Sequence, residues 1–481
     1  MKNNLQFTLL ALALAAGVHT ALGAPGELDP TFDGDGKVTT RVSTNDFGFD
    51  EAKAVSVQPD GRILAVGDSD GRIALVRYLS NGSLDPDFGT GGIVTTLLSQ
   101  DDYFYVNGAA LQPDGKIVVV GQVNIATPAS VDLFAARYQT NGALDPGFGT
   151  GGIARHDLGF DDSGTAVKVQ PDGRLVVAAY GYDFNLNQSL FGALRLLTNG
   201  ALDTTFSGDG LAEAVFAGSD LAQPTALALQ PDGNIVVAGY AFFGSSNLLA
   251  LARFQANGTL DATFGSGGVV TTSLGATNAS AADVAVQSDG RVVVAGSASF
   301  GFNGWLLAAR YQTNGTLDTS FDGDGLVWAT NAGAAAIVLQ ADGKMVIAGY
   351  AGNDTGLFRF NPDGSPDSGF GTGGRVQTPL SVAADSASGV ALQSDGKMVI
   401  AGGLFDPINS AGYFALARYL GDGAASAGPV LAITRAVPGE VTISWTPATP
   451  GFVLQERTTL TLGVWTNAPS GAANPVTVPA T

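Results

Sequence analysis

The chain is 481 residues long and carries 43 acidic against 23 basic side chains, a formal charge of −20 at neutral pH. This charge argues against a nucleic-acid partner, because neutralising phosphates requires basic patches. Cysteine is absent and histidine occurs only at His19 and His156, which excludes thiol chemistry, disulfides and multi-histidine metal sites.

Residues 1–24 have the pattern of a secretory signal peptide. Lys2 supplies a positive charge, residues 5–18 form an apolar run, and residues 21–24 offer the small side chains of a cleavage site. The run is shorter than the roughly 20 residues that a membrane-spanning helix needs, and no later segment is apolar enough. We therefore expect a mature chain without a membrane span that is secreted, periplasmic or displayed at the cell surface.

One phrase recurs seven times along the chain. It reads QPDGRILAVG in the first copy and QSDGKMVIAG in the last, and the copies are spaced by 54, 58, 60, 57, 53 and 53 residues. This period lies near that of propeller blades and is far too long for a solenoid coil. The copies begin at Gln58, Gln112, Gln170, Gln230, Gln287, Gln340 and Gln393.

Each repeat carries four strand signals. In the second repeat these cover 109–111, 116–121, 133–138 and 152–155, and they are bounded by Asp-Gly and Asn-Gly turns. Beyond the leader, no segment shows a convincing helical period. Four antiparallel strands repeated seven times predict an all-β chain folded as a seven-bladed β-propeller.

The two ends of the repeat region complement each other. Residues 28–40 match the last quarter of a repeat, and the seventh repeat ends at 416–423 without that quarter. A strand from the N-terminal side would complete the seventh blade and remove the exposed edges of the ring. We expect a monomeric propeller over residues 25–423, with Val38 near Ala415.

Residues 424–481 differ in composition from the repeats. A linker rich in Gly, Ala and Ser precedes alternating segments at 441–445 and 452–454, with Trp445 and Trp465 as candidate core aromatics. The pattern predicts a small β-sandwich-like module, which is similar to the fibronectin-type-III-like tails of secreted bacterial proteins. One more strand is expected after its last residues, so either the module folds incompletely or the chain lacks a few C-terminal residues.

The repeat phrases resemble those of the delta-60 repeat family, a group of secreted bacterial proteins with propeller repeats. The resemblance rests on Q-x-D-G-x-φ-φ-φ-A-G, on [LF]-A-x-R-[YF] and on N-G-x-L-D-x-x-F-G-x-G-G, and it covers residues 28–423. It implies the propeller fold. It implies no reaction and no ligand.

Two charged positions recur in every repeat, an arginine in the third strand and an aspartate in the turn that follows. The simplest interpretation is a bidentate ion pair between strand and turn. Seven equivalent catalytic centres would be implausible, so we interpret the pairs as structural. The arginines are Arg77, Arg137, Arg195, Arg253, Arg310, Arg359 and Arg418, and the aspartates are Asp29, Asp85, Asp145, Asp203, Asp261, Asp318 and Asp367.

Binding groups are expected in the variable loops at one end of the blades. In a four-stranded meander, the loops between strands two and three share an end with the connections to the next blade, and these segments vary. Aromatic residues beside Asn and Asp suit sugar rings or protein side chains, unless they merely cover the blade ends. The candidate ligand-binding residues are Tyr182, Phe184, Phe243, Phe302, Trp305 and Phe405.

Two Asp-Gly-Asp-Gly turns resemble the start of a calcium loop. Asp33 and Asp35 lie in the first turn and Asp322 and Asp324 in the second, but the closing glutamate of the twelve-residue pattern is missing. Ordinary tight turns account for the same residues. Calcium is therefore the weaker interpretation, and we expect no cofactor.

The connections between blades also carry carboxylates, among them Asp50, Glu51, Asp162, Asp220 and Asp385. They either attract cations and basic partners to one mouth of the channel or keep an exported protein soluble. Two functions stay open: a non-catalytic scaffold that binds a protein or glycan through its loop face, and a carbohydrate-active hydrolase or lyase with paired loop carboxylates. We favour the scaffold, because no repeat carries a distinctive acidic pair that its siblings lack.

Overall fold

The structure is a computed structural model that describes residues 24–422 except 46, 98–101, 127–128, 160, 184–187 and 302. Phe184 and Phe302, two of the predicted binding residues, thus lie outside the described residues. Beyond this range the structure describes the backbone of six short strands. They are β1 (Ala13–Ala15), β30 (Val430–Val437), β31 (Glu440–Thr446), β32 (Val453–Glu456), β33 (Thr466–Asn467) and β34 (Val476–Pro479).

The chain divides into two compact units, one of residues 24–421 and one formed by residues 1–23 with 422–481. In the second unit, β30, β31 and β34 form one sheet, and β1, β32 and β33 form another. β1 lies within the predicted signal segment and pairs antiparallel with β32. The signal peptide, the domain boundaries and the fibronectin-type-III-like tail stay predictions.

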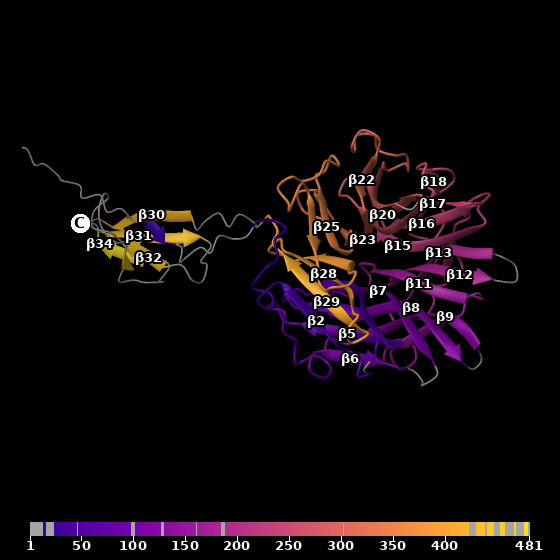
Figure 1. The fold of residues 1–481 in the computed structure, drawn as a ribbon, viewed down its shortest axis with the longest axis horizontal. Coiled ribbons are helices and arrows are strands. Elements are labelled where there is room, and N and C mark those ends of the chain that lie inside the picture. Colours follow the sequence, from indigo (N-terminus) through magenta and orange to yellow (C-terminus); the bar gives the residue numbers. More distant parts are fainter. Residues whose placement is uncertain are drawn as a thin grey trace, which may run out of the picture. The chain divides into compact units, whose positions relative to one another are not determined.

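The first unit consists of seven four-stranded antiparallel meanders, the blades (Figure 1). Five of them are separate sheets, and blades four and five are joined into one sheet by a single parallel bridge between Asn247 and Asn278. Blade one contains β3 (Asp50–Val57), β4 (Ile63–Ser69), β5 (Arg72–Tyr78) and β6 (Ile93–Thr96). Blade two contains β7 (Tyr103–Leu111), β8 (Ile117–Ala126), β9 (Ala129–Tyr138) and β10 (Ile153–His156). Blade three contains β11 (Asp161–Val169), β12 (Leu175–Asp183), β13 (Gln188–Leu196) and β14 (Leu211–Glu213).

The remaining blades repeat this meander. Blade four contains β15 (Leu221–Leu229), β16 (Ile235–Phe243), β17 (Ser246–Phe254) and β18 (Val269–Thr272). Blade five contains β19 (Asn278–Val286), β20 (Val292–Phe300), β21 (Asn303–Tyr311) and β22 (Leu326–Thr330). Blade six contains β23 (Ala332–Leu339), β24 (Met345–Ala351), β25 (Asp354–Phe360) and β26 (Arg375–Thr378). Blade seven contains β27 (Ser386–Leu392), β28 (Met398–Asp406), β29 (Ala411–Tyr419) and β2 (Lys37–Thr40).

The prediction of an all-β, seven-bladed propeller is confirmed. The described part of the chain contains no helix, and hence none long and apolar enough to cross a bilayer. The first three strands of the second repeat extend beyond the predicted ranges, and pairing between β8 and β9 continues to Ala126 and Ala129. The fourth, β10, has the predicted length and begins one residue later than predicted.

The N-terminal strand completes the seventh blade. β2 pairs antiparallel with β29, which places Val38 opposite Leu416 and Thr39 opposite Ala415. The first strands of successive blades contact one another all the way round, and β27 of blade seven contacts β3 of blade one. We call this last junction the seam.

Apolar side chains are buried between the blades. Seven clusters occur, and each joins two neighbouring blades. At the seam, Phe414 and Leu416 of blade seven pack with Ile63 and Val76 of blade one. The seam is therefore packed in the same way as the six internal junctions, and each blade depends on its neighbours for burial of its faces.

Candidate functional site

The two ends of the blades differ in character. One end, the turn face, carries the repeated Asp-Gly turns and the turns between strands three and four. The other end, the loop face, carries the loops between strands two and three and the connections to the next blade. The chain enters and leaves the propeller at the turn face, where Gly26 N donates to Leu420 O at 2.8 Å.

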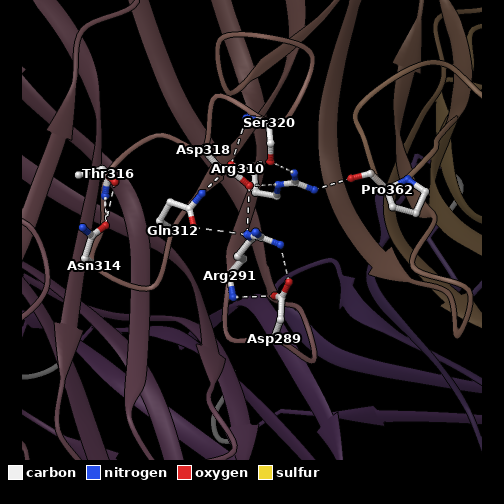
Figure 2. Close-up of polar contacts among 9 residues, drawn as sticks. All are labelled: Asp289, Arg291, Arg310, Gln312, Asn314, Thr316, Asp318, Ser320 and Pro362. Atoms are coloured by element: carbon white, nitrogen blue, oxygen red, sulfur yellow. Dashed lines mark hydrogen bonds and ion pairs between the residues drawn. The ribbon is translucent and has the colours of Figure 1, made fainter.

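A buried arginine network occupies the turn face, and Figure 2 shows it in blade five. Arg310 Nε donates to Asp318 Oδ2 at 2.7 Å, and Arg310 Nη2 donates to Ser320 Oγ at 3.1 Å. Arg310 Nη1 donates to the Pro362 carbonyl of blade six. The guanidinium carbon also lies 4.6 Å from the centre of the Phe321 ring, within cation–π range.

The predicted pairing of arginine and aspartate occurs in every blade. The Nε to Oδ2 distance is 2.7–2.8 Å in all seven pairs. In six blades the hydrogen bond from the arginine to the aspartate is the single bond from Nε to Oδ2 and not the predicted bidentate pair. Nη1 donates instead to a main-chain carbonyl of the next blade. These six arginines therefore join neighbouring blades as well as strand to turn. Their carbonyl partners belong to Ser80, Thr140, Thr198, Ala256, Thr313 and Pro362.

Sequence reasoning missed a second cation at the same aspartate. In six repeats the residue after the Asp-Gly turn is basic, and its nitrogen lies 2.9–3.1 Å from the turn aspartate. Blade four has Asn234 at this position, so Asp261 forms an ion pair with Arg253 alone. The missed signal was the Arg or Lys that follows D-G in the repeated phrase: Arg62, Lys116, Arg174, Arg291, Lys344 and Lys397.

The network lowers the pKa of its carboxyl groups. Burial by itself would raise the pKa of Asp318, but hydrogen bonds from Ser320 and the charge of Arg310 outweigh it. A similar balance lowers the pKa of the other six turn aspartates. These aspartates are therefore ionised at neutral pH and act as structural counterions.

Stability is expected to fall in acid. The unfolded chain binds protons near the ordinary aspartate pKa of about 4, whereas the folded turn aspartates bind them only at lower pH. The contribution of the turn aspartates to the free energy of unfolding should thus be constant between neutral pH and about pH 5, and it should drop steeply below about pH 4. Thermal melts across this range provide the check, and a melting temperature that stays constant down to pH 3 would contradict the prediction.

Large apolar side chains are exposed at the loop face. Nine of the ten described examples lie in its loops and strand ends, and Leu84 is the exception. Five of the nine lie in three segments around blade seven: the connection 41–49 to blade one, the connection 379–385 from blade six, and the end of β28 with the loop that follows. We define the seam patch as Phe47, Phe49, Val382, Phe405 and Ile408, whose exposed fractions are 78%, 55%, 87%, 41% and 85%.

Two pockets lie side by side in the seam patch, and Tyr413 of β29 lines both. The first, of about 410 Å³, is lined by Leu380, Val382, Leu404 and Pro407. The second, of about 550 Å³, is lined by residues of the 41–49 connection together with Ile408 and Asn409. The guanidinium of Arg41 stands 5.3 Å from the centre of the Tyr413 ring.

Buried aspartates fix the loops that form the pockets. Asp50 accepts hydrogen bonds from Val42 N at 2.8 Å and Ser43 N at 3.0 Å. Asp385 accepts from Leu380 N at 2.8 Å and Ser381 N at 2.9 Å. Two of the predicted loop carboxylates thus order the backbone of the seam patch, which makes the patch a preformed surface.

The four predicted binding residues that the structure describes do not form one site. Tyr182 lies near the end of β12 in blade three. Phe243 is half-buried against the apolar cluster between blades three and four. Trp305 contacts Phe300 and Trp328 edge to face, with ring centres 5.7 and 6.3 Å away, on blade five. Phe405 belongs to the seam patch. The structure thus separates four described candidates onto four blades, and it brings Phe405 together with residues that sequence reasoning did not single out.

The Asp-Gly-Asp-Gly turns are closed by their own aspartates. Asp35 Oδ1 accepts from Lys37 N at 2.9 Å, and Asp324 Oδ1 accepts from Leu326 N at 2.9 Å. Asp33 and Asp322 take left-handed backbone angles, with φ of 51° and 49°. Among the residues that the structure describes, no group of three or more His, Asp or Glu could hold a metal ion.

Seven segments of the chain match the family described as "Domain of unknown function (DUF5122) beta-propeller". They cover residues 58–88, 112–148, 170–206, 230–264, 287–321, 340–370 and 393–425. The chain belongs to a β-propeller repeat family. The match begins at each Gln-x-Asp-Gly phrase and includes the arginine and turn aspartate of the network in the first six repeats, so the family pattern coincides with the turn face. The delta-60 name stays a prediction.

Solved structures of propeller proteins resemble the chain at low identity. A PQQ-bound aldose sugar dehydrogenase from Streptomyces coelicolor is 13% identical, with a TM-score of 0.39, and the match covers 65% of this chain and 94% of that one. The polysaccharide lyase Uly1 is 10% identical, with a TM-score of 0.45 and coverage of 79% and 94%. Drosophila Semaphorin 1b is 9% identical, with a TM-score of 0.43 and coverage of 82% and 87%. No curated protein matches the chain, and we draw no functional conclusion from these similarities.

Proposed function

We propose that the protein is an exported, non-catalytic scaffold that binds a protein partner through the seam patch. The observation that supports this is the exposure of five large apolar side chains on one ordered surface. Clusters of this kind mark interaction sites, because single exposed apolar residues are common but contiguous ones are not.

The chemistry of the seam patch favours a protein over a glycan. Sugar rings stack on flat aromatic faces, whereas the two most exposed residues of the patch, Val382 and Ile408, are aliphatic. Aliphatic side chains offer no stacking face but pack well against apolar side chains of a protein. A glycan remains the alternative at the aromatic cluster of Phe300, Trp305 and Trp328.

The hydrolase alternative has one observation in its favour. Burial raises the pKa of Asp68 to about 6, with Glu51 contributing and Lys53 opposing, and its Oδ2 is buried without a hydrogen-bond partner among the described residues. A carboxyl group with this pKa suits a general acid. However, Glu51, the neighbouring carboxylate, is paired with Lys53 at 2.7 Å. A hydrolysis screen that detects turnover lost in Asp68→Asn would support this alternative and reject the scaffold.

A panel of variants tests binding at the seam patch. Peptides that bind the purified chain are selected from a displayed random library. The affinity of each selected peptide is then measured for the parent chain and for the variants Ile408→Asp and Val382→Asp. We expect either substitution to weaken binding by about tenfold or more, because it places a charge in an apolar contact. The matched control is Val215→Asp, since Val215 is equally exposed at the loop face but lies before blade four. Peptides that bind all three variants equally would reject the seam patch.

A further inference from the structure

We propose, resting on the proposed function, that the partner presents an extended basic segment with two apolar side chains, one for each pocket beside Tyr413. The two pockets share Tyr413 as their dividing wall. An extended segment suits this arrangement, because residues on one side of an extended chain are spaced regularly and can enter adjacent pockets. The proposal therefore specifies the shape of the partner as well as its surface.

The pockets combine apolar walls with polar rims. Leu380, Val382, Leu404 and Pro407 line the smaller pocket, and Phe47 and Ile408 line the larger one. Arg41, Ser43, Thr44, Asn45 and Asn409 also line the larger pocket, which is therefore the more polar of the two. Side-chain amides and hydroxyls of this kind can hydrogen-bond the main chain of an extended segment, while the apolar walls select its side chains.

The charges at the rim favour a basic segment. Asp70 accepts from Asn45 Nδ2 at 2.7 Å and Phe49 N at 2.8 Å, and Asp406 accepts from Ile408 N at 2.8 Å and Asn409 Nδ2 at 2.6 Å. The donors of these bonds are neutral. Two cations stand nearby: Arg41 lies 3.7 Å from buried Asp50 and also acts on Asp70, and Lys37 Nζ donates to the Pro379 carbonyl at 2.7 Å. Four aspartates, Asp50, Asp70, Asp385 and Asp406, outnumber these two cations, which leaves an excess of negative charge at the rim.

The same charges disfavour two other occupants. A second copy of this chain would bring together two bodies with a formal charge of −20 each, so repulsion opposes that contact. The chain's own residues 424–481 carry two arginines and two glutamates, so they have no net charge to complement the rim. A separate basic partner is the occupant that the surface fits.

The composition of selected peptides tests this proposal. Labelled peptides from the selection are synthesised with both apolar positions intact, with either one replaced by serine, and with the flanking basic residues replaced by glutamate. Their fluorescence anisotropy is measured with the purified chain. We expect each serine replacement to weaken binding about tenfold, and the glutamate flanks to weaken it by a similar factor at low salt. Asp406→Asn should reduce the preference for basic flanks, and unchanged thermal melts would show that the variants fold.

The outcomes separate the two proposals. Peptides that bind the seam patch with one apolar residue, or with acidic flanks, would overturn the two-pocket basic segment and leave the scaffold standing. A selection that yields no peptide sensitive to Ile408→Asp or Val382→Asp would overturn both. Concentration-dependent dimerisation abolished by Ile408→Asp would assign the patch to a second copy and would also overturn the basic segment.

Discussion

Replacing Asp318 by asparagine is expected to lower the free energy of unfolding by about 3–5 kcal/mol. The substitution keeps the shape of the side chain and removes its charge. Arg310, which is 4% exposed, then stays buried without its counterion, and Arg291 loses the partner that lies 3.1 Å away. An unpaired buried guanidinium is costly because water cannot solvate it. Urea unfolding of the variant beside the parent chain gives the measurement.

Blade four supplies the matched control for this prediction. Asp261 has one cationic partner, Arg253 at 2.8 Å, because Asn234 stands where the other blades have a base. Asp261→Asn removes one ion pair, whereas Asp318→Asn removes two and leaves Arg291 with Asp289 at 2.6 Å as its remaining carboxylate partner, so we expect the smaller loss in blade four. Equal losses in the two variants would show that the second cation contributes nothing, as is common for partly exposed pairs.

In the arginine network, the sequence of one repeat predicts the contacts within a blade but not the contacts between blades. Arg310 and Asp318 lie eight residues apart within one repeat, so strand and turn signals were enough to predict their contact. The bond from Arg310 Nη1 to the Pro362 carbonyl crosses 52 residues and depends on how blades five and six meet. No local pattern encodes that geometry, because every blade must first be packed against its neighbour.

The seam patch was hidden from sequence reasoning for a related reason. Sequence reasoning selects Phe405 because it lies at the loop between strands two and three of its blade. Phe47 and Val382 lie in connections between blades, which vary in length and share no repeated phrase. Only closure of the ring, through β2 on β29, brings the 41–49 connection to the other two segments. Asp50 and Asp385 were interpreted as surface charges because sequence does not show the main-chain N–H groups that they accept from.

Because β2 closes the ring on β29, a disulfide between these two strands is expected to raise the free energy of unfolding by a large amount. Thr39 and Ala415 are direct partners in β2 and β29, and the chain has no cysteine of its own, so Thr39→Cys with Ala415→Cys can form one bond only. A disulfide here closes a loop of about 380 residues, and the chain-entropy estimate gives about 6 kcal/mol of stabilisation for such a loop. Urea unfolding of the oxidised and reduced forms measures the gain.

The equivalent pair in blade four is the control. Ala250 and Thr271 are partners in β17 and β18, and a disulfide between them closes a loop of about 20 residues, for which the same estimate is about 3 kcal/mol. Direct partners of an antiparallel pair lie close enough for the bond in both cases. If the blade-four pair oxidises and the seam pair does not, β2 does not lie on β29 in solution. The ring would then be open, and the seam patch, which closure assembles, would not exist as one surface.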